Sequence, residues 1–128
     1  MREILFRGKD IKGNWYEGLL AHNIAKDEWY ISNKAGISTA YQVRPETIGQ
    51  FTGLTDKNGV KIFEGDIVRY GDTIHKVVFE QRNGTAYFGL VYSPIETLQF
   101  GHYQDLRQLE VIGNIYENPE LIEGESDD

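Results

Sequence analysis

The 128-residue chain contains no cysteine, which excludes disulfide bonds and thiolate metal sites. Its hydrophobic runs are short, and none approaches the roughly 20 apolar residues of a membrane-spanning helix. The first ten residues, MREILFRGKD, lack the apolar stretch of about 7–15 residues that marks a secretory signal. We therefore expect a cytoplasmic protein with no membrane partner.

Basic residues are also scarce, because 13 Lys and Arg stand against 20 Asp and Glu, for a net charge of −7. Six of the acids lie at the C-terminal end: Glu117, Glu120, Glu123, Glu125, Asp127 and Asp128. The rest of the chain, with 14 acids and 13 basic residues, is almost neutral. Non-specific nucleic-acid binding needs a basic footprint, so the composition disfavours it without excluding a local basic patch. The last six residues, 123–128, are predicted to be an acidic disordered tail.

Short alternating runs, rich in aromatic and β-branched residues, are present along most of the chain and predict strands. Asn58-Gly59 and Asn83-Gly84 lie between such runs and predict hairpin turns, because both residue types tolerate positive φ. We expect an all-β fold, or a β-rich fold with a short helix. Its hairpins would build small antiparallel sheets or a partly closed barrel within a single domain of residues 1–122. The expected strands are 4–7, 15–20, 28–32, 41–45, 48–54, 60–63, 67–70, 74–80, 86–92 and 108–116.

Two segments fit this pattern poorly. Residues 32–40 are small and polar, which predicts a loop. In residues 94–103, Ile95, Leu98 and His102 follow helical spacing, so a short helix is an alternative to a loop there.

Three segments, taken in order, resemble the YopX family of bacteriophage and prophage proteins. They are Arg2–Arg7 with Trp15, the run Gly49–Val68, and the run Glu110–Leu121. The resemblance implies a β-rich fold, a phage or prophage origin in bacteria, and assembly into homo-oligomers. It implies no reaction and no catalytic residues.

Polar residues of the central run are expected to bind turn amides: Thr52, Asp56, Asn58, Glu64 and Asp66. A calcium loop starting at Asp56 is excluded, because its sixth and twelfth positions would hold Lys61 and Ile67. A metal shared by Asp56, Glu64 and Asp66, or by His22, His75 and His102, is a weaker hypothesis. The sequence contains no recognisable catalytic constellation and no phosphate-binding glycine loop, so we predict no cofactor, no metal and no enzyme activity.

The function that we favour is non-enzymatic contact with protein, either a second copy of the chain or an unknown partner. Trp29, Tyr30 and Phe100 are the candidate interface residues, because they border segments of unassigned structure.

The alternative is a small nucleic-acid-binding β-barrel, with Arg69, Lys76 and Arg82 as candidate contacts. Its aromatic residues would come from Tyr70, Tyr87 and Phe88, although strand alternation allows only some of these to share a face. Mimicry of DNA by the acidic residues ranks last, because so many of them lie in the tail.

Overall fold

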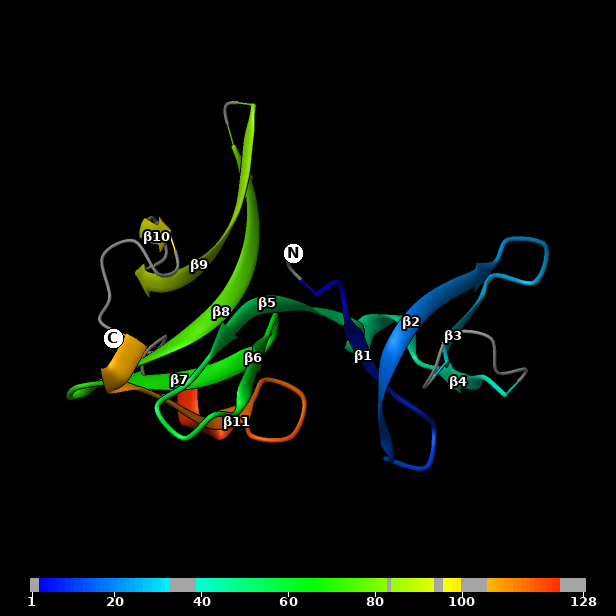
Figure 1. Cartoon of the computed structure of the whole chain (residues 1–128), viewed down its shortest axis with the longest axis horizontal. Coiled ribbons are helices and arrows are strands. Elements are labelled where there is room, and N and C mark those ends of the chain that lie inside the picture. Colours follow the sequence, from blue (N-terminus) through cyan, green and yellow to red (C-terminus); the bar gives the residue numbers. More distant parts are fainter. Residues whose placement is uncertain (1–2, 33–38, 83, 94–95, 100–105, 123–128) are drawn as a thin grey trace. The chain divides into compact units, whose positions relative to one another are not determined.

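The computed structural model describes residues 3–32, 39–82, 84–93, 96–99 and 106–122. The all-β prediction is confirmed, since strands make up most of these residues (Figure 1). The chain forms two compact units, Met1–Gly53 and Leu54–Asp128. Whether these units act as the single domain expected for residues 1–122 stays a prediction, and the tail at 123–128 lies outside the described residues.

The described strands form two antiparallel sheets, with orders β4-β3-β2-β1-β5-β6 and β10-β9-β8-β7-β11. Short 3-10 helices, η1 (Pro45–Thr47) and η2 (Leu106–Gln108), precede β5 and β11. No helix among the described residues is long and apolar enough to cross a membrane. The strands are β1 (Phe6–Lys9), β2 (Trp15–Asn23), β3 (Glu28–Ser32), β4 (Tyr41–Val43), β5 (Gly49–Thr55), β6 (Lys61–Phe63), β7 (Asp66–Tyr70), β8 (Thr73–Arg82), β9 (Thr85–Ser93), β10 (Glu96–Gln99) and β11 (Leu109–Asn114).

In the first unit β1 to β4 form an antiparallel meander, and its sheet curls back on itself. The backbone N–H of Arg44, just after β4, donates to the carbonyl of Lys9 in β1 at 2.8 Å. The N–H of Lys9 donates in turn to Oγ1 of the buried Thr47 at 2.9 Å. Gly8 allows this close approach, because a Cβ there would lie 2.8 Å from Cγ2 of Val43.

The second unit is built on the antiparallel meander β7-β8-β9, with β11 pairing along β7 and β10 along β9. A buried apolar cluster fills one face of this sheet, where alternate residues of each strand point inward. Its members are Ile62, Val68, Val77, Leu90 and Leu109.

The helical alternative for residues 94–103 is wrong where the structure describes this segment. Residues 96–99 form the edge strand β10, with Leu98 opposite Leu90 and Thr97 opposite Val91 of β9. The spacing of apolar residues that suggested a helix also occurs in short strands with a β-bulge. β10 has such an irregularity, because its register shifts between Glu96 and Thr97. His102 lies outside the described residues.

Candidate functional site

The predicted interface residues Trp29 and Tyr30 lie next to each other on β3, and their side chains are half-buried. Trp29 is opposite His22 and stacks on its ring at 3.8 Å, whereas Tyr30 is opposite Ala21. Because neighbouring residues of a strand point to opposite faces, these two aromatics do not form one contact surface. Phe100 lies outside the described residues, so its place at an interface stays a prediction.

The predicted nucleic-acid contacts Arg69 and Lys76 lie on one face of the second unit. Arg69 pairs with Ile74 and Lys76 pairs with Ile67, so both basic residues fall on the same side of the β7–β8 ladder. Tyr87, opposite Glu80, shares this face.

Tyr70 and Phe88, the other two aromatics of that hypothesis, belong to the opposite face of the sheet. They are packed against the buried apolar cluster. Arg82 pairs with Thr85 at the far end of the β8–β9 hairpin, and its side chain is not among those described. The contact set expected from the sequence is therefore only partly brought together.

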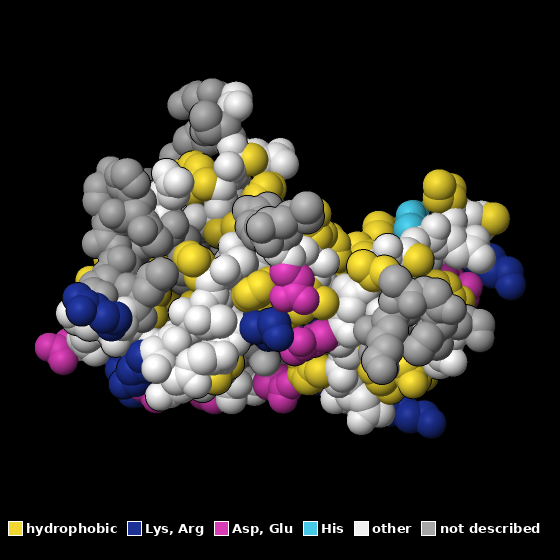
Figure 2. Space-filling view, viewed as in Figure 1, with side chains coloured by type: hydrophobic (Ala, Val, Ile, Leu, Met, Phe, Trp, Pro, Cys, Tyr) yellow, Lys and Arg dark blue, Asp and Glu magenta, His cyan; other side chains and the backbone are white. Residues whose placement is uncertain are grey.

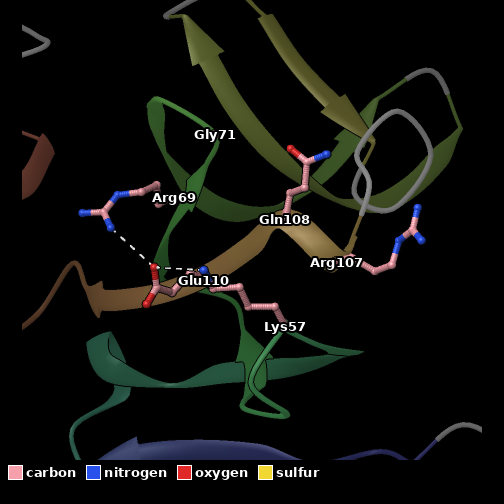
Figure 3. Close-up of a pocket in the computed structure, with 6 residues that line it drawn as sticks. All are labelled: Lys57, Arg69, Gly71, Arg107, Gln108 and Glu110. Atoms are coloured by element: carbon pink, nitrogen blue, oxygen red, sulfur yellow. Dashed lines mark hydrogen bonds and ion pairs between the residues drawn. The ribbon is translucent and has the colours of Figure 1, made fainter.

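A shallow hollow of about 270 Å³ opens beside Arg69 in the second unit (Figure 3). The nearby carboxylate of Glu110 lies 3.4 Å from Nη1 of Arg69 and 3.8 Å from Nζ of Lys57, measured to the same Oε1 atom. The hollow is lined by Lys57, Arg69, Gly71, Arg107, Gln108 and Glu110. Of these lining residues, the sequence identified only Arg69 as a candidate contact. Lys57 and residues 107–110 come from two further segments, and no local motif links them to Arg69.

Asp56 has the turn-forming role expected of it, together with a tertiary role that the sequence does not show. Its Oδ1 accepts the N–H groups of Asn58 at 2.8 Å and Val60 at 2.9 Å, while its Oδ2 accepts the N–H of Val111 in β11 at 2.9 Å. Burial by itself would raise the pKa of this carboxyl, but the three backbone donors, with Lys57 nearby, lower it below the ordinary 3.8.

Asp66 is the second buried turn acid, and its Oδ2 accepts the N–H of Phe63 at 2.8 Å. The folding role predicted for Asp56 and Asp66 is therefore confirmed by their contacts. Among the described residues, no group of three His, Asp or Glu side chains is placed to hold a metal ion.

The two described histidines are bound locally within separate units. Nε2 of His22 lies 2.9 Å from Oδ1 of Asp27 in the β2–β3 turn. The buried His75 lies between Oγ1 of Thr73, at 2.7 Å from Nε2, and the carbonyl of Val91, at 3.0 Å from Nδ1. These contacts fit a structural role for both side chains.

The far part of the β8–β9 hairpin extends beyond the sheet, and we call residues 78–88 the β8–β9 arm (Figure 1). In the described registers β7 pairs with β8 only at Thr73–Lys76, and β10 pairs with β9 only from Gly89 onward. The arm is therefore a two-stranded ribbon. Phe79 meets Phe88 edge-on at 5.0 Å on the arm, yet remains 39% exposed. Figure 2 shows hydrophobic side chains at the surface of this part of the second unit.

Comparison with known proteins identifies relatives of the whole chain. The family model described as YopX protein matches residues 6–123. Protein EF1440 from Enterococcus faecalis, known from a crystal structure, is similar at 26% identity and a TM-score of 0.52, over 96% of this chain and 100% of its own. No curated protein matches. Because the family model covers nearly all of the sequence, this chain belongs to the YopX family.

Proposed function

We propose that the protein is a non-enzymatic accessory protein of a bacteriophage or prophage. It acts in the bacterial cytoplasm by contact with protein, first of all with a second copy of itself. The phage origin is proposed from the resemblance to the YopX family. The observation that supports contact with protein is the exposed β8–β9 arm.

The arm has the properties of an element that is completed by a partner. A two-stranded ribbon is only marginally stable in water by itself, and its unpaired strand edges are templates for pairing with another chain. The side chain of Phe79, which is 39% exposed, adds apolar surface that a partner would cover. Aromatic residues, phenylalanine included, are enriched in the buried cores of protein interfaces.

A second copy of the chain suits the edge of β8 by charge. Antiparallel pairing of two β8 strands about a two-fold axis through Gln81 places residue 80 of each copy opposite residue 82 of the other. Residue 80 is Glu and residue 82 is Arg, so each crossing joins opposite charges. A symmetric arrangement of this type closes as a dimer and leaves no further edge of β8 open.

Sedimentation velocity at tens of micromolar tests the proposal. We expect the natural sequence to form a dimer. The dissociation constant of the Phe79→Ser dimer should be at least roughly tenfold higher, because the substitution removes the apolar side chain that the second copy would cover. Ile24→Ser is the matched control: Ile24 is 82% exposed in the β2–β3 turn of the other unit, and its loss should not change association.

A charge exchange separates a lost contact from a damaged arm. Glu80→Arg should weaken the dimer, since it sets like charges opposite each other, and adding Arg82→Glu to the same chain should restore it. A strict monomer at tens of micromolar would contradict self-association. If Glu80→Arg and the double variant with Arg82→Glu had the same dissociation constant, pairing through β8 would be contradicted.

A further inference from the structure

The β5–β6 turn contains a pair of residues with a reaction of its own. Asn58 precedes Gly59, and the backbone nitrogen of the residue after an asparagine can attack the side-chain carbon Cγ. Ammonia leaves and a cyclic succinimide forms, which water then opens to aspartate or to isoaspartate. A glycine favours the attack, because it has no side chain to hinder the ring and its backbone rotates freely. The sequence contains one other such pair, Asn83-Gly84.

Asn58 is open to the two reagents of this reaction, hydroxide and water. Its side chain is exposed, and nothing lies within 4 Å of the place that a Cβ of Gly59 would occupy. Packing by the described residues therefore does not protect the pair. The backbone conformation of the turn is what controls the reaction.

Hydrogen bonds to Asp56 hold the turn in a conformation that opposes ring closure. The N–H of Gly59, whose nitrogen has to lose its proton and attack, donates to the carbonyl of Asp56 at 3.0 Å. The N–H groups of Asn58 and Val60 both donate to Oδ1 of Asp56, at 2.8 Å and 2.9 Å. A carbonyl is too weak a base to take an amide proton, so the bonded N–H of Gly59 is less reactive than one that contacts water. The turn must therefore open locally before its nitrogen reaches Cγ of Asn58.

We propose that Asn58 is a site of spontaneous deamidation and that the carboxylate of Asp56 sets its rate. Oδ2 of Asp56 accepts the N–H of Val111 in β11 at 2.9 Å, which ties the turn to the sheet. The turn opens only when contacts that stabilise the second unit break. The reaction is therefore slow in the folded protein and faster when that unit loosens.

Isoaspartate at position 58 would remove this protection. Its main chain runs through Cβ and Cγ, so the backbone between residues 58 and 59 gains one carbon atom. Oδ1 of Asp56 then cannot keep the N–H groups of residues 58 and 60 both at hydrogen-bond distance, because the added atom lies between them. The link from Asp56 to Val111 weakens with them. Deamidation is thus a one-way chemical change that releases the β5–β6 turn from β11, and it does not depend on self-association through the β8–β9 arm.

Ageing of the purified full chain in mildly alkaline buffer, followed by peptide mass spectrometry, tests the rate. We expect Asn58 to convert about tenfold faster in Asp56→Ala than in the natural sequence, because the turn loses its acceptor. Asn83 in the same samples is the internal reference. Unfolding of the whole second unit would speed conversion at both asparagines, whereas opening of the turn speeds it at Asn58 alone. Asp56→Asn, which keeps one acceptor oxygen, gives the same comparison if Asp56→Ala does not fold.

Amide hydrogen exchange at Val111 tests the consequence. Aged protein that carries isoaspartate at position 58 should lose protection there. Asn58→Asp is the matched control, because it adds the same charge without lengthening the backbone, and it should keep the protection. The proposal is overturned if Asn58 converts no faster in Asp56→Asn than in the natural sequence, if Asn83 accelerates as much as Asn58 in that variant, or if isoaspartate leaves exchange at Val111 unchanged.

Discussion

The same turn occurs once in each unit of this protein, with very different surroundings. Asp10 and Asp56 both accept, on Oδ1, the N–H groups of the residues two and four positions later. In both turns the fourth residue is a glycine at positive φ, Gly13 at 92° and Gly59 at 80°. The turns thus have the same local geometry.

The second carboxylate oxygen makes the difference between them. Oδ2 of Asp10 stays within its own neighbourhood, with Asn14 Nδ2 at 3.3 Å and the hydroxyl of Tyr16 at 3.2 Å. Oδ2 of Asp56 accepts the N–H of Val111, which is 55 residues away, and the side chain is buried. One local motif therefore shapes a surface turn in one unit and joins the β5–β6 turn to β11 in the other.

Replacing the two aspartates should give the largest contrast. Asp56→Ala leaves three backbone N–H groups without their acceptor, and we expect it to lower the free energy of unfolding of the second unit by about 3 kcal/mol. Asp10→Ala frees donors that water can reach, and its effect should be clearly smaller. Denaturant unfolding combined with amide hydrogen exchange at Val111 and Val60 would measure the first effect. Tryptophan fluorescence would follow the second, because Trp15 and Trp29 both lie in the first unit. Equal losses would mean that the contact with Val111 contributes nothing.

Acid should weaken the second unit through the same carboxylate. The pKa of Asp56 is lowered in the folded state: burial opposes the charge, but the N–H donors of Val111, Val60 and Asn58 outweigh it. The stability that this carboxylate contributes is fully present above its ordinary pKa of 3.8 and is lost as the pH falls through its lower folded-state pKa. Asp56→Asn, which cannot ionise, should therefore flatten the fall in denaturation midpoint below about pH 4. An unchanged acid dependence in that variant would assign the effect to other groups.

Asp10 provides the comparison for this pH dependence. Its pKa is also lowered, with the N–H of Asn14 as the main cause. The stability that the Asp10 carboxylate contributes is therefore also lost as the pH falls. Because this side chain is only half-buried whereas Asp56 is buried, we expect Asp10→Asn to change the acid dependence less than Asp56→Asn does.

Substitution of the two turn glycines should cause the smallest loss of stability, and the loss should be the same in both turns. Gly13→Ala and Gly59→Ala each place a Cβ at positive φ, which costs about 1 kcal/mol. The space around both positions is open: the nearest atom to a Cβ at Gly13 is Cε of Lys9 at 3.7 Å, and nothing lies within 4 Å at Gly59. The cost is thus one of backbone conformation alone. Unequal losses in chemical denaturation would show that the turns differ in ways beyond the aspartate contacts.

Local sequence was a good guide to strands and turns and a poor guide to sites. Alternating residues and the Asn58-Gly59 pair placed β5 and β6 correctly, because turn geometry depends on a few neighbouring residues. Residues 96–99 were ambiguous, since their strand exists only through its pairing with β9. The hollow beside Arg69 was found only in part, because Lys57, Arg69 and Glu110 meet across elements that are distant in the sequence.

The sequence by itself determined that this chain folds as β-strands joined by short glycine-containing turns, since side-chain alternation and positive φ are local properties. It also carried enough of the family pattern to place the chain among YopX proteins. Only the tertiary structure decided that β1 pairs with β5 and β7 with β11, and that β10 lies at a sheet edge. It also decided that Asp56 binds β11 while Asp10 stays at the surface. The reason is physical: burial and long-range hydrogen bonds depend on what the rest of the chain brings to a residue, and no single segment encodes that.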